Sequence, residues 1–262
     1  MYGISPVDRG RSIDWSRTSA DYAVHRPGPP ESFFLRLSAL GIGAPGQRIL
    51  DLGTGTGLLA RQFARQGARV TGIDIAEGQI EAARRLAAEE GLQVSFAVTP
   101  AEASGQPDAA FDAITANQCW LYFDKARMIP EVRRLLAPGG VLATSHFSWL
   151  PRLSPIASQS EALVLKYNPD WSGADWHRTI PPMPEWAAAD FALAAMFWYD
   201  EEVPFTRESW RGRIRACRGI GATLDEAAVH RFDAEHEALL ASIAAPSFTI
   251  RHRIDAHILQ PK

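Results

Sequence analysis

The sequence predicts a doubly wound α/β fold, in which a parallel sheet carries helices on both faces. Strand-like and helix-like segments alternate from Arg48 to His146, and alternating units of this length form parallel sheets covered by helices. A turn with three glycines follows the first strand, at the carboxyl end where open α/β sheets bind ligands. After His146 the alternation stops at a segment rich in proline and tryptophan. We therefore expect one α/β core with an inserted lid.

Apolar runs and helical periodicity define the elements in order. Strands are expected at 48–52, 69–74, 93–98, 111–116 and 140–146, with helices at 57–66, 78–90 and 124–137. Residues 147–191 hold six prolines and four tryptophans around a helix expected near 155–167. A strand near 192–203, helices near 206–217 and 223–245 and a strand at 247–259 complete the expected elements. Thr223 and Glu226 have capping-box spacing at the start of the last helix.

The glycine turn reads Asp-Leu-Gly-Thr-Gly-Thr-Gly from Asp51 to Gly57. Glycine has no Cβ and adopts positive φ without strain, so such a turn lets the backbone approach a flat ligand closely. The dinucleotide-binding pattern would place its third glycine at Leu58, but here that glycine is Gly57. This spacing excludes an NAD-dependent oxidoreductase.

An acidic residue ends the second expected strand, about 20 positions beyond the glycines. The Asp74 carboxylate is placed to accept the ribose hydroxyls of an adenosyl group. The alternative is that Asp74 is the N-cap of the following helix. Further along, Leu136-Ala-Pro-Gly-Gly140 precedes an apolar strand, and its Pro138 and Gly139 favour a tight turn that ends the preceding helix.

These three features, in this order, resemble the class I S-adenosylmethionine-dependent methyltransferases, which have a Rossmann-like sheet. The likeness covers Arg48 to His146 and is closest to the small-molecule branch with trans-aconitate and quinone methyltransferases. The segments Tyr22–Pro30, with its Y-x-x-x-R-P pattern, and Ala116–Asp124 are similar to that branch. The resemblance implies that the last two strands form an antiparallel edge, that S-adenosyl-L-methionine is the cofactor, and that S-adenosyl-L-homocysteine is the product.

The resemblance also implies roles for individual residues. The turn and Asp51 would hold the methionine part of the cofactor, Asp74 the ribose, and Ile75 the adenine. Where the family often has an aspartate for the adenine amine, this chain has Pro100, so backbone groups nearby would substitute. The expected cofactor-binding residues are Tyr22, Asp51, Gly53, Gly55, Gly57, Asp74, Ile75, Gln79, Ala101, Glu102, Asn117 and Gln118. For Tyr22 the alternative is that its ring packs an N-terminal helix onto the core.

Methyl transfer depends mainly on in-line alignment, and a base is needed only when the acceptor must lose a proton. His146 ends the fifth expected strand and is the first candidate for a catalytic base; the alternative is a partly buried histidine bonded to the backbone. His25 is a second candidate, with a surface histidine as its alternative.

Tryptophans and arginines supply the candidates for acceptor binding. Trp120, Trp149, Trp171 and Trp176 are expected substrate residues, because large rings bind apolar, aromatic or cationic groups. Alternatively, these rings form the core of the insertion itself. Five arginines cluster on one expected helix and would bind an acidic acceptor, or else form a solvated face balanced by Glu201, Glu202 and Glu208. They are Arg207, Arg211, Arg213, Arg215 and Arg218.

The composition and charge of the chain limit the classes of partner and the cellular compartment that we expect. A net charge of −3 and a pI near 6.2 argue against a nucleic-acid partner. Residues 1–15 lack the apolar core of a signal peptide, no apolar stretch is long enough to span a bilayer, and two cysteines suit a reducing compartment. We expect a cytoplasmic protein. Its histidines lack metal-ligand spacing, so we expect no metal, and the oligomeric state stays open.

Taken together, we expect a single domain with an N-terminal helical cover at 1–46, a cofactor-binding core at 47–146, a lid at 147–191 and completion of the sheet at 192–262. The expected function is methyl transfer from S-adenosylmethionine to a small-molecule acceptor that is apolar, aromatic or carboxylate-bearing. The alternative function is a non-catalytic S-adenosylmethionine-binding or regulatory domain.

Overall fold

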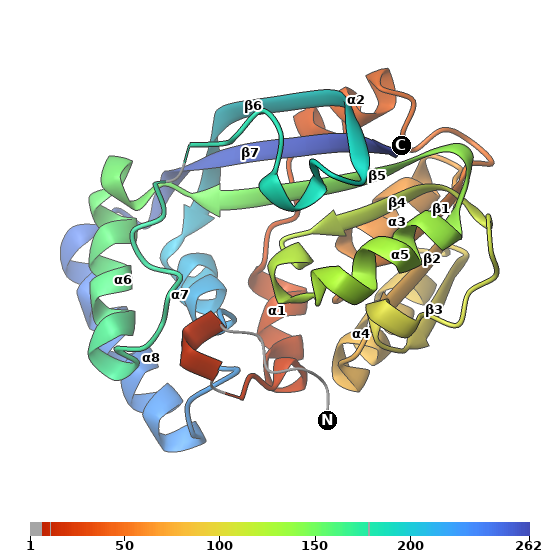
Figure 1. Ribbon diagram of the computed structural model, residues 1–262. Helices are drawn as coiled ribbons and strands as arrows, with labels where there is room; N and C mark the ends of the chain where they lie inside the picture. The colour runs from red at the N-terminus through yellow and green to blue at the C-terminus, as the bar shows by residue number, and fades with distance from the viewer. Residues whose placement is uncertain (1–6, 11, 178) are drawn as a thin grey trace. The chain divides into compact units, whose positions relative to one another are not determined.

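The computed structural model describes residues 7–10, 12–177 and 179–262. Parts of the expected N-terminal cover and one position of the expected lid lie outside these ranges. Among the described residues a seven-stranded sheet has the order β3-β2-β1-β4-β5-β7-β6 (Figure 1). Its strands are β1 Arg48–Leu52, β2 Arg69–Asp74, β3 Val94–Val98, β4 Phe111–Asn117, β5 Leu136–Trp149, β6 Phe191–Thr206 and β7 Ser247–Pro261.

The α-helices follow the expected alternation. They are α1 Ser19–His25, α2 Glu31–Ala39, α3 Leu58–Arg65, α4 Glu77–Glu89, α5 Lys125–Leu135, α6 Pro155–Tyr167, α7 Arg207–Arg215 and α8 Glu226–Ile243. Short 3-10 helices lie at Val7–Gly10, Trp15–Thr18, Ala101–Ala103, Trp120–Tyr122, Pro151–Leu153 and Glu185–Ala187. None of the helices in the described ranges is long and apolar enough to cross a membrane.

Strands β1 to β5 form the parallel part of the sheet. β1 pairs with β2 and with β4, and the outer pairs β2–β3 and β4–β5 are also parallel. Residues of β1 after Arg48 are buried, which is why this strand is a continuous apolar run rather than an alternating one. The registers align Asp51 with Gly72 on one side and with Thr115 on the other. The carboxyl ends of β1, β2 and β4 therefore meet at one edge.

The last two strands form the antiparallel edge that was predicted. Asp200 of β6 binds Arg253 of β7, whereas Glu202, two residues later, binds Arg251, two residues earlier. Because the residue numbers of the partners increase along β6 and decrease along β7, the two strands are antiparallel. β7 is inserted between β5 and β6, so β6 is the outermost strand.

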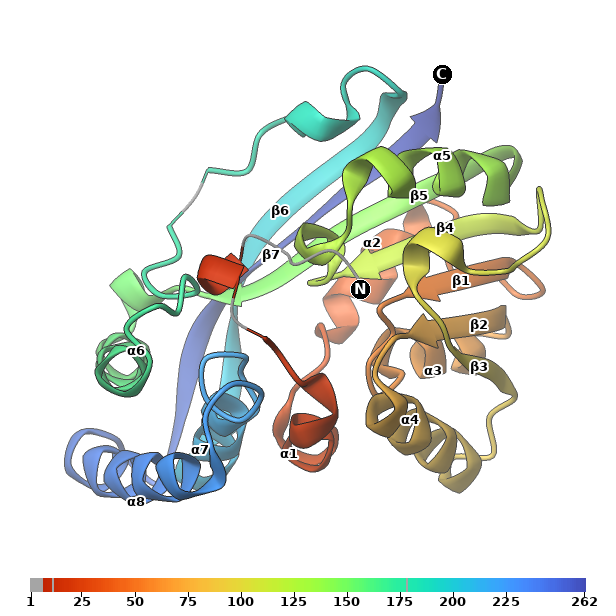
Figure 2. The ribbon, with the colours of Figure 1, turned by 60° about the horizontal axis from the view of Figure 1, so that its bottom comes forward.

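Helices cover both faces of the parallel part. α5 lies on one face, where Met128, Val132 and Leu135 pack in one cluster with buried residues of β1, β4 and β5. α3 and α4 lie on the opposite side of these strands from α5 (Figure 2). The aromatic rings of Phe33 and Phe34 from α2 and Phe63 from α3 meet edge to face there. Both faces are thus apolar, as a doubly wound fold requires.

Two local expectations were wrong. The expected turn at Pro138 and Gly139 is part of β5, where a positive φ of 78° at Gly139 accompanies a register shift against β4. A bulge of this kind keeps the strand paired while adding residues to one side. At the last helix, Asp225 is the N-cap and accepts from the backbone N–H of Ala228 at 2.7 Å. Thr223 instead donates to the carbonyl of Arg218, because its hydroxyl lies outside the helix start.

The chain divides into two compact units that cut across the expected segment boundaries. Unit 1 consists of Met1–Pro27, Ser148–Thr179 and Tyr199–Arg253. Unit 2 consists of Gly28–Phe147, Ile180–Trp198 and Ile254–Lys262. Unit 2 contains the parallel strands and α2 to α5, whereas unit 1 contains α1, α6, α7 and α8.

Unit 1 is built around a buried polar contact between three helices. Trp210 of α7 is fully buried and donates its indole N–H to the Ser160 hydroxyl of α6 at 3.0 Å. His236 of α8, also fully buried, places Nε2 at 2.9 Å from the same hydroxyl. Burial lowers the pKa of His236 to about 4, so the ring is neutral at neutral pH. The three helices are therefore joined by one hydroxyl group.

Candidate functional site

The glycine turn leaves β1 and enters α3 within unit 2. Gly53, Gly55 and Gly57 have positive φ values of 57°, 55° and 76°. A Cβ at Gly53 would lie 2.8 Å from the Cβ of Cys119, and a Cβ at Gly57 would lie 3.0 Å from the Phe96 ring. These two positions therefore exclude larger side chains by contact as well as by backbone conformation. The backbone of the turn is held close to the end of β4.

Asp51 connects this turn to β4. Its side chain is buried, and its two carboxylate oxygens accept hydroxyl hydrogen bonds of 2.6 Å from Thr54 and Thr115. Burial raises the pKa of Asp51 to about 6, although the two hydroxyl donors oppose the rise. A contact with the methionine part of the cofactor stays a prediction. The contacts observed give Asp51 a positioning role.

Asp74 connects the same turn to β2. One carboxylate oxygen accepts from the backbone N–H of Gly55 and the other from that of Ala76, each at 2.9 Å. Burial raises the pKa of Asp74, while these N–H donors lower it. Ala76, rather than Asp74, is the N-cap residue of α4. Each carboxylate oxygen has a further lone pair, so the predicted ribose hydroxyls can still bind.

The residues expected around the adenine lie beside Asp74 or at the next strand end. Ile75 is 56% exposed, whereas Gln79 on α4 and Ala101 are buried. The Glu102 carboxylate accepts from the backbone N–H of Asp124 at 3.0 Å, just before α5 begins. An exposed isoleucine at the carboxyl edge of the sheet suits a flat apolar ligand. The adenine contacts of these four residues stay predictions.

The carboxyl ends of β4 and β5 lie together. Asn117 is in register with Ser145, whose hydroxyl donates to its side-chain oxygen at 3.1 Å. Gln118 has a positive φ of 64°, donates its backbone N–H to Ser145 at 2.9 Å, and binds the Phe147 carbonyl through its amide. Strained residues of this kind are concentrated at functional sites. The strand order reverses between β1 and β4, where doubly wound sheets bind ligands.

His146 follows Ser145 on β5, and its ring is paired with a carboxylate. Nδ1 of His146 lies 2.9 Å from Oδ2 of Asp255 on β7. The Asp255 side chain is 1% exposed and that of His146 37% exposed. The second carboxylate oxygen of Asp255 has no hydrogen-bond partner among the described residues. Asp255 was missed in the sequence, because 109 residues separate it from His146 and only the antiparallel pairing brings them together.

Three other residues of the site were also missed. Thr54 and Thr115 bind Asp51, as described above. Cys119 donates its thiol to the Leu52 carbonyl at 3.0 Å, and burial raises the pKa of that thiol well above its usual value. Thr54 lies within the glycine motif, so its position was a usable signal. No sequence motif around Thr115 or Cys119 indicated that these residues would be part of the site.

The tryptophans expected to bind the acceptor are mostly buried. Trp120 packs against Trp186 in unit 2, with ring centroids 4.5 Å apart. In unit 1, the Trp149 indole donates to Glu161 at 2.6 Å, Trp171 is 5% exposed, and Trp176 is half-buried. Acceptor contacts of these rings stay predictions, and the observed contacts agree better with core packing for three of the four. Tyr22 and His25 lie on α1 in unit 1.

Most of the arginine cluster is neutralised by the chain itself, but not by the glutamates that were expected. Arg211 pairs with Asp233 and Glu237, Arg215 with Asp21 and Asp233, and Arg218 with Asp8. Arg207 donates to the Ala244 carbonyl. Glu202 is paired with Arg251. The charge-balanced alternative therefore holds for Arg211, Arg215 and Arg218, with acids from distant parts of the sequence.

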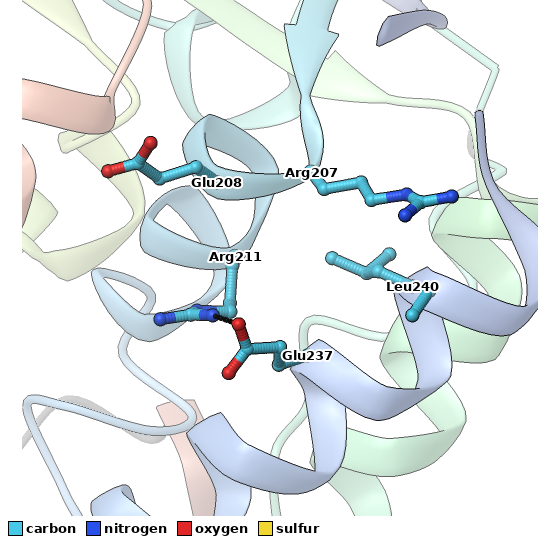
Figure 3. Close-up of a pocket in the computed structure, with 6 residues that line it drawn as sticks. Arg207, Glu208, Arg211, Glu237 and Leu240 are labelled. Carbon is cyan, nitrogen blue, oxygen red and sulfur yellow. Dashed lines mark ion pairs between the residues drawn. The ribbon is translucent and has the colours of Figure 1, made fainter. Parts of the chain in front are cut away.

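A pocket in unit 1 lies between α7 and α8. It is lined by Arg207, Glu208, Arg211, Glu237, Leu240 and Ala241, and Arg211 and Glu237 pair across it at 2.6 Å (Figure 3). Its two arginines and two glutamates balance in charge. It contains none of the residues expected to bind the cofactor, so we do not assign it to the reaction. Across the described residues, no three His, Cys, Asp or Glu side chains are grouped as metal ligands.

Comparison with known proteins decides the family. A sequence profile described as a methyltransferase domain matches residues 49–140. The chain is 30% identical over 248 residues to a demethylmenaquinone methyltransferase of Thermus thermophilus, covering 94% of this chain and 86% of that protein. The chain belongs to the methyltransferase family.

Other methyltransferases support this assignment. A ubiquinone biosynthesis O-methyltransferase of Methylocella silvestris is 38% identical over 157 residues, which are 60% of each chain. The matches to this protein and two others of that name span 55–64% of their lengths. A methyltransferase structure from Geobacter sulfurreducens has a TM-score of 0.53 at 21% identity, covering 95% of this chain and 97% of that one, and so shares the fold. The predicted family, Rossmann-like fold and S-adenosylmethionine cofactor are thereby confirmed.

Proposed function

We propose that this methyltransferase transfers a methyl group from S-adenosylmethionine to the hydroxyl oxygen of an aromatic small molecule. The observation that carries the proposal is the His146–Asp255 pair at the carboxyl edge of the sheet. His146 directly follows Ser145 of β5, which is in register with Asn117 at the carboxyl end of β4. The next strand beyond β4 is β1, and the glycine turn follows the carboxyl end of β1. A proton-accepting group and a cofactor turn thus share one edge of unit 2.

The residues at this edge fit the cofactor. The turn presents backbone with three positive φ values, which allows close approach to the methionine part. Asp74 is fixed by two N–H donors and retains lone pairs for the ribose. Ile75 offers an exposed apolar side chain to the adenine. When bound, S-adenosylmethionine supplies an electrophilic methyl group on a positively charged sulfur.

His146 acts as the general base in this proposal. Its Nδ1 is bound to Asp255, so Nε2 is the nitrogen that accepts a proton. The hydroxyl proton of the acceptor moves to Nε2 as the oxygen takes the methyl group, and the bond from methyl to sulfur breaks with its electron pair left on sulfur. The buried carboxylate of Asp255 holds the ring in the required tautomer and stabilises the imidazolium that forms. Asp255 is therefore a positioning residue.

The acceptor class follows from the base. A histidine base is useful for an acceptor with a weakly acidic proton, such as a phenolic hydroxyl. Relatives of this chain are named as O-methyltransferases of ubiquinone biosynthesis and as a demethylmenaquinone methyltransferase; those names describe the relatives. They support an aromatic acceptor with ring oxygens as the first class to test.

The proposal is tested with radiolabelled S-adenosylmethionine and a panel of catechols and hydroquinones. We expect methyl transfer by the wild type, and a loss of kcat of about 100-fold or more in His146→Gln, with unchanged affinity for S-adenosylhomocysteine. His257→Gln is the matched control, because His257 of β7 contacts a backbone carbonyl, that of Pro181, at 2.7 Å. Equal kcat in wild type and His146→Gln would exclude the base. Cofactor binding without transfer to any acceptor would favour the non-catalytic alternative.

A further inference from the structure

We propose that Lys125 is a positioning residue for methyl transfer, and that its ammonium group holds the loop after β4 against the glycine turn. This loop, the β4 loop, consists of residues 118–124 and joins β4 to the start of α5. Lys125 is the first residue of α5, and the strand, the loop and the helix all belong to unit 2. The consequence for catalysis rests on the proposed function, whereas the hold on the loop does not.

The β4 loop lies directly against the first glycine of the turn. The Cys119 thiol donates to the carbonyl of Leu52, the residue before that glycine, at 3.0 Å. A Cβ at Gly53 would lie 2.8 Å from the Cβ of Cys119 and 3.6 Å from the ring of Phe123. Residues near both ends of the β4 loop therefore lie beside the turn, and a shift of the loop would change the space there.

Two carbonyl groups of the β4 loop accept hydrogen bonds from the Lys125 ammonium. Nζ lies 2.5 Å from the carbonyl oxygen of Trp120 and 2.6 Å from that of Phe123. The same nitrogen lies 5.6 Å from the centre of the Trp120 ring, within the range of a cation–π contact. An ammonium group has three donors, so this one side chain binds both carbonyls at once and fixes the middle of the loop.

The charge of Lys125 is not balanced by an acid at contact distance. The side chain is half-buried, and burial lowers the pKa of Lys125, although the nearby charges of Glu102 and Asp124 oppose the shift. In the described ranges, Lys125 forms no ion pair with a carboxylate, whereas exposed Lys166 of α6 pairs with Glu235. Removing an ammonium group partly from water costs free energy. Its placement on two carbonyls therefore indicates a role in fixing them.

The contacts of Lys125 assign it a different role from that of His146. Two carbonyl oxygens and the face of the Trp120 ring all stabilise the charged form of the amine, which has no lone pair to accept a proton. His146 keeps Nε2 available for the proton of the acceptor, because its Nδ1 is bound to Asp255. We therefore assign the loop contacts to Lys125 and leave proton transfer to His146.

Other groups hold the two ends of the β4 loop. Gln118 donates its backbone N–H to the Ser145 carbonyl at 2.9 Å, and Asp124 donates its backbone N–H to the Glu102 carboxylate at 3.0 Å. Loss of the ammonium should therefore loosen the middle of the loop and leave the strand and the helix in place. A looser loop would hold the acceptor less accurately in line with the methyl group.

Methionine in place of Lys125 keeps a long side chain but has no donor. We expect Lys125→Met to lower kcat for a phenolic acceptor by about tenfold to a hundredfold, because a small misplacement of reacting groups has an effect of this size. Affinity for S-adenosylhomocysteine in titration calorimetry should be unchanged, because Asp74 binds the turn independently of the loop. Lys125→Arg keeps the charge and enough donors for both carbonyls, and should recover most of kcat.

Hydrogen exchange gives a readout that needs no turnover. The backbone N–H groups of Tyr122, Phe123 and Asp124 are hydrogen-bonded. In Lys125→Met they should exchange about tenfold faster, the effect of losing one hydrogen bond to a charged group. Lys262→Met is the matched control, because Lys262 also donates to a backbone carbonyl, that of Ala188, at 2.7 Å, and Ala188 lies outside the β4 loop. Exchange in the loop should keep the wild-type rate in this control.

Wild-type exchange of the loop in Lys125→Met would overturn the proposal, and so would an unchanged kcat. A fall in S-adenosylhomocysteine affinity as large as the fall in kcat would show a general structural role instead. A pH profile of kcat that loses its acidic limb in Lys125→Met would make Lys125 the base. If the wild type methylates no acceptor, the proposed function fails, and exchange alone then decides whether Lys125 holds the loop. Lys125→Gln keeps the test open if methionine impairs folding.

Discussion

At the residue scale, the two aspartates of the cofactor edge have different surroundings. Asp74 accepts two backbone N–H groups and keeps lone pairs available, whereas both oxygens of buried Asp51 accept hydroxyl groups inside the protein. The sequence predicted Asp74 as a cofactor ligand from its spacing to the glycines, and the resemblance to class I methyltransferases implied the same for Asp51. It did not predict the enclosure of Asp51, because Thr115 lies 64 residues away and only strand pairing brings it close.

Asp74→Ala should weaken binding of S-adenosylhomocysteine by about 1.5–3 kcal/mol, because charge-assisted hydrogen bonds to the ribose are lost. Titration calorimetry measures the change, and circular dichroism checks that the turn and sheet still fold. Asp74→Asn retains one acceptor oxygen for the backbone N–H groups and should lose less. A folded Asp74→Ala with wild-type affinity would remove Asp74 from the site.

Asp51→Asn should change how stability depends on pH. The pKa of Asp51 is raised to about 6 in the folded protein, above the unfolded value, so its neutral form is favoured by folding. Its contribution to stability is full at pH below 4 and is lost as pH rises through 6, by roughly 3 kcal/mol. Urea unfolding from pH 4 to 7 should show the free-energy difference between wild type and Asp51→Asn shrinking by that amount. Parallel curves for the two proteins would contradict the prediction.

At the element scale, local patterns predicted most helices and strands because they depend on neighbours in sequence. α3, α4 and α6 and the strands β1 to β4 begin and end within one residue or so of their expected limits. The failures involve long-range partners. β5, Leu136–Trp149, extends beyond both of its expected limits, 140 and 146, because it pairs through a bulge with β4 and then along β7. Such partners leave no local signal.

The helices α6, α7 and α8 depend on a neutral histidine. The pKa of His236 is lowered to about 4 by burial, so folding favours its neutral form. Its contribution is present above the unfolded pKa near 6.5 and is lost as pH falls toward 4, by roughly 3 kcal/mol. This sign is opposite to that of Asp51. Urea unfolding of His236→Gln, in which an amide can still bind Ser160, should show a weaker loss between pH 6.5 and 4 than wild type.

At the scale of the whole molecule, the parallel core could be predicted and the division into units could not. The core follows from alternating elements and the glycine turn, both of which are local. The two units each combine three separate segments, so their boundaries depend on contacts between distant residues. For the same reason the His146–Asp255 pair was not predicted as a pair, although His146 had been singled out from its position at the end of a strand.

Trp171 and Trp176 test whether the tryptophan-rich segment is a lid or part of a core. Trp171 is 5% exposed and closely approached by Gly219, so Trp171→Ala should cost about 3–5 kcal/mol of stability. Trp176 is half-buried, so Trp176→Ala should reduce the free energy of unfolding far less. If the Trp176 ring touches the acceptor, the variant should have a higher KM for the acceptor and an unchanged affinity for the cofactor. Urea unfolding and steady-state kinetics provide the two measurements. A fully stable Trp171→Ala would show that the ring is not part of a core.

The chain passes from one unit to the other at five junctions, and three of them fall inside β5, β6 and β7. Neither unit is therefore a contiguous stretch that gene truncation can release, and neither can be exchanged with a relative by a single crossover. Recombination between two such methyltransferases would have to replace three segments together to transfer one intact unit. Sequence changes within either unit are thus confined mainly to point substitutions and loop insertions, because these preserve the strands that continue from one unit to the other.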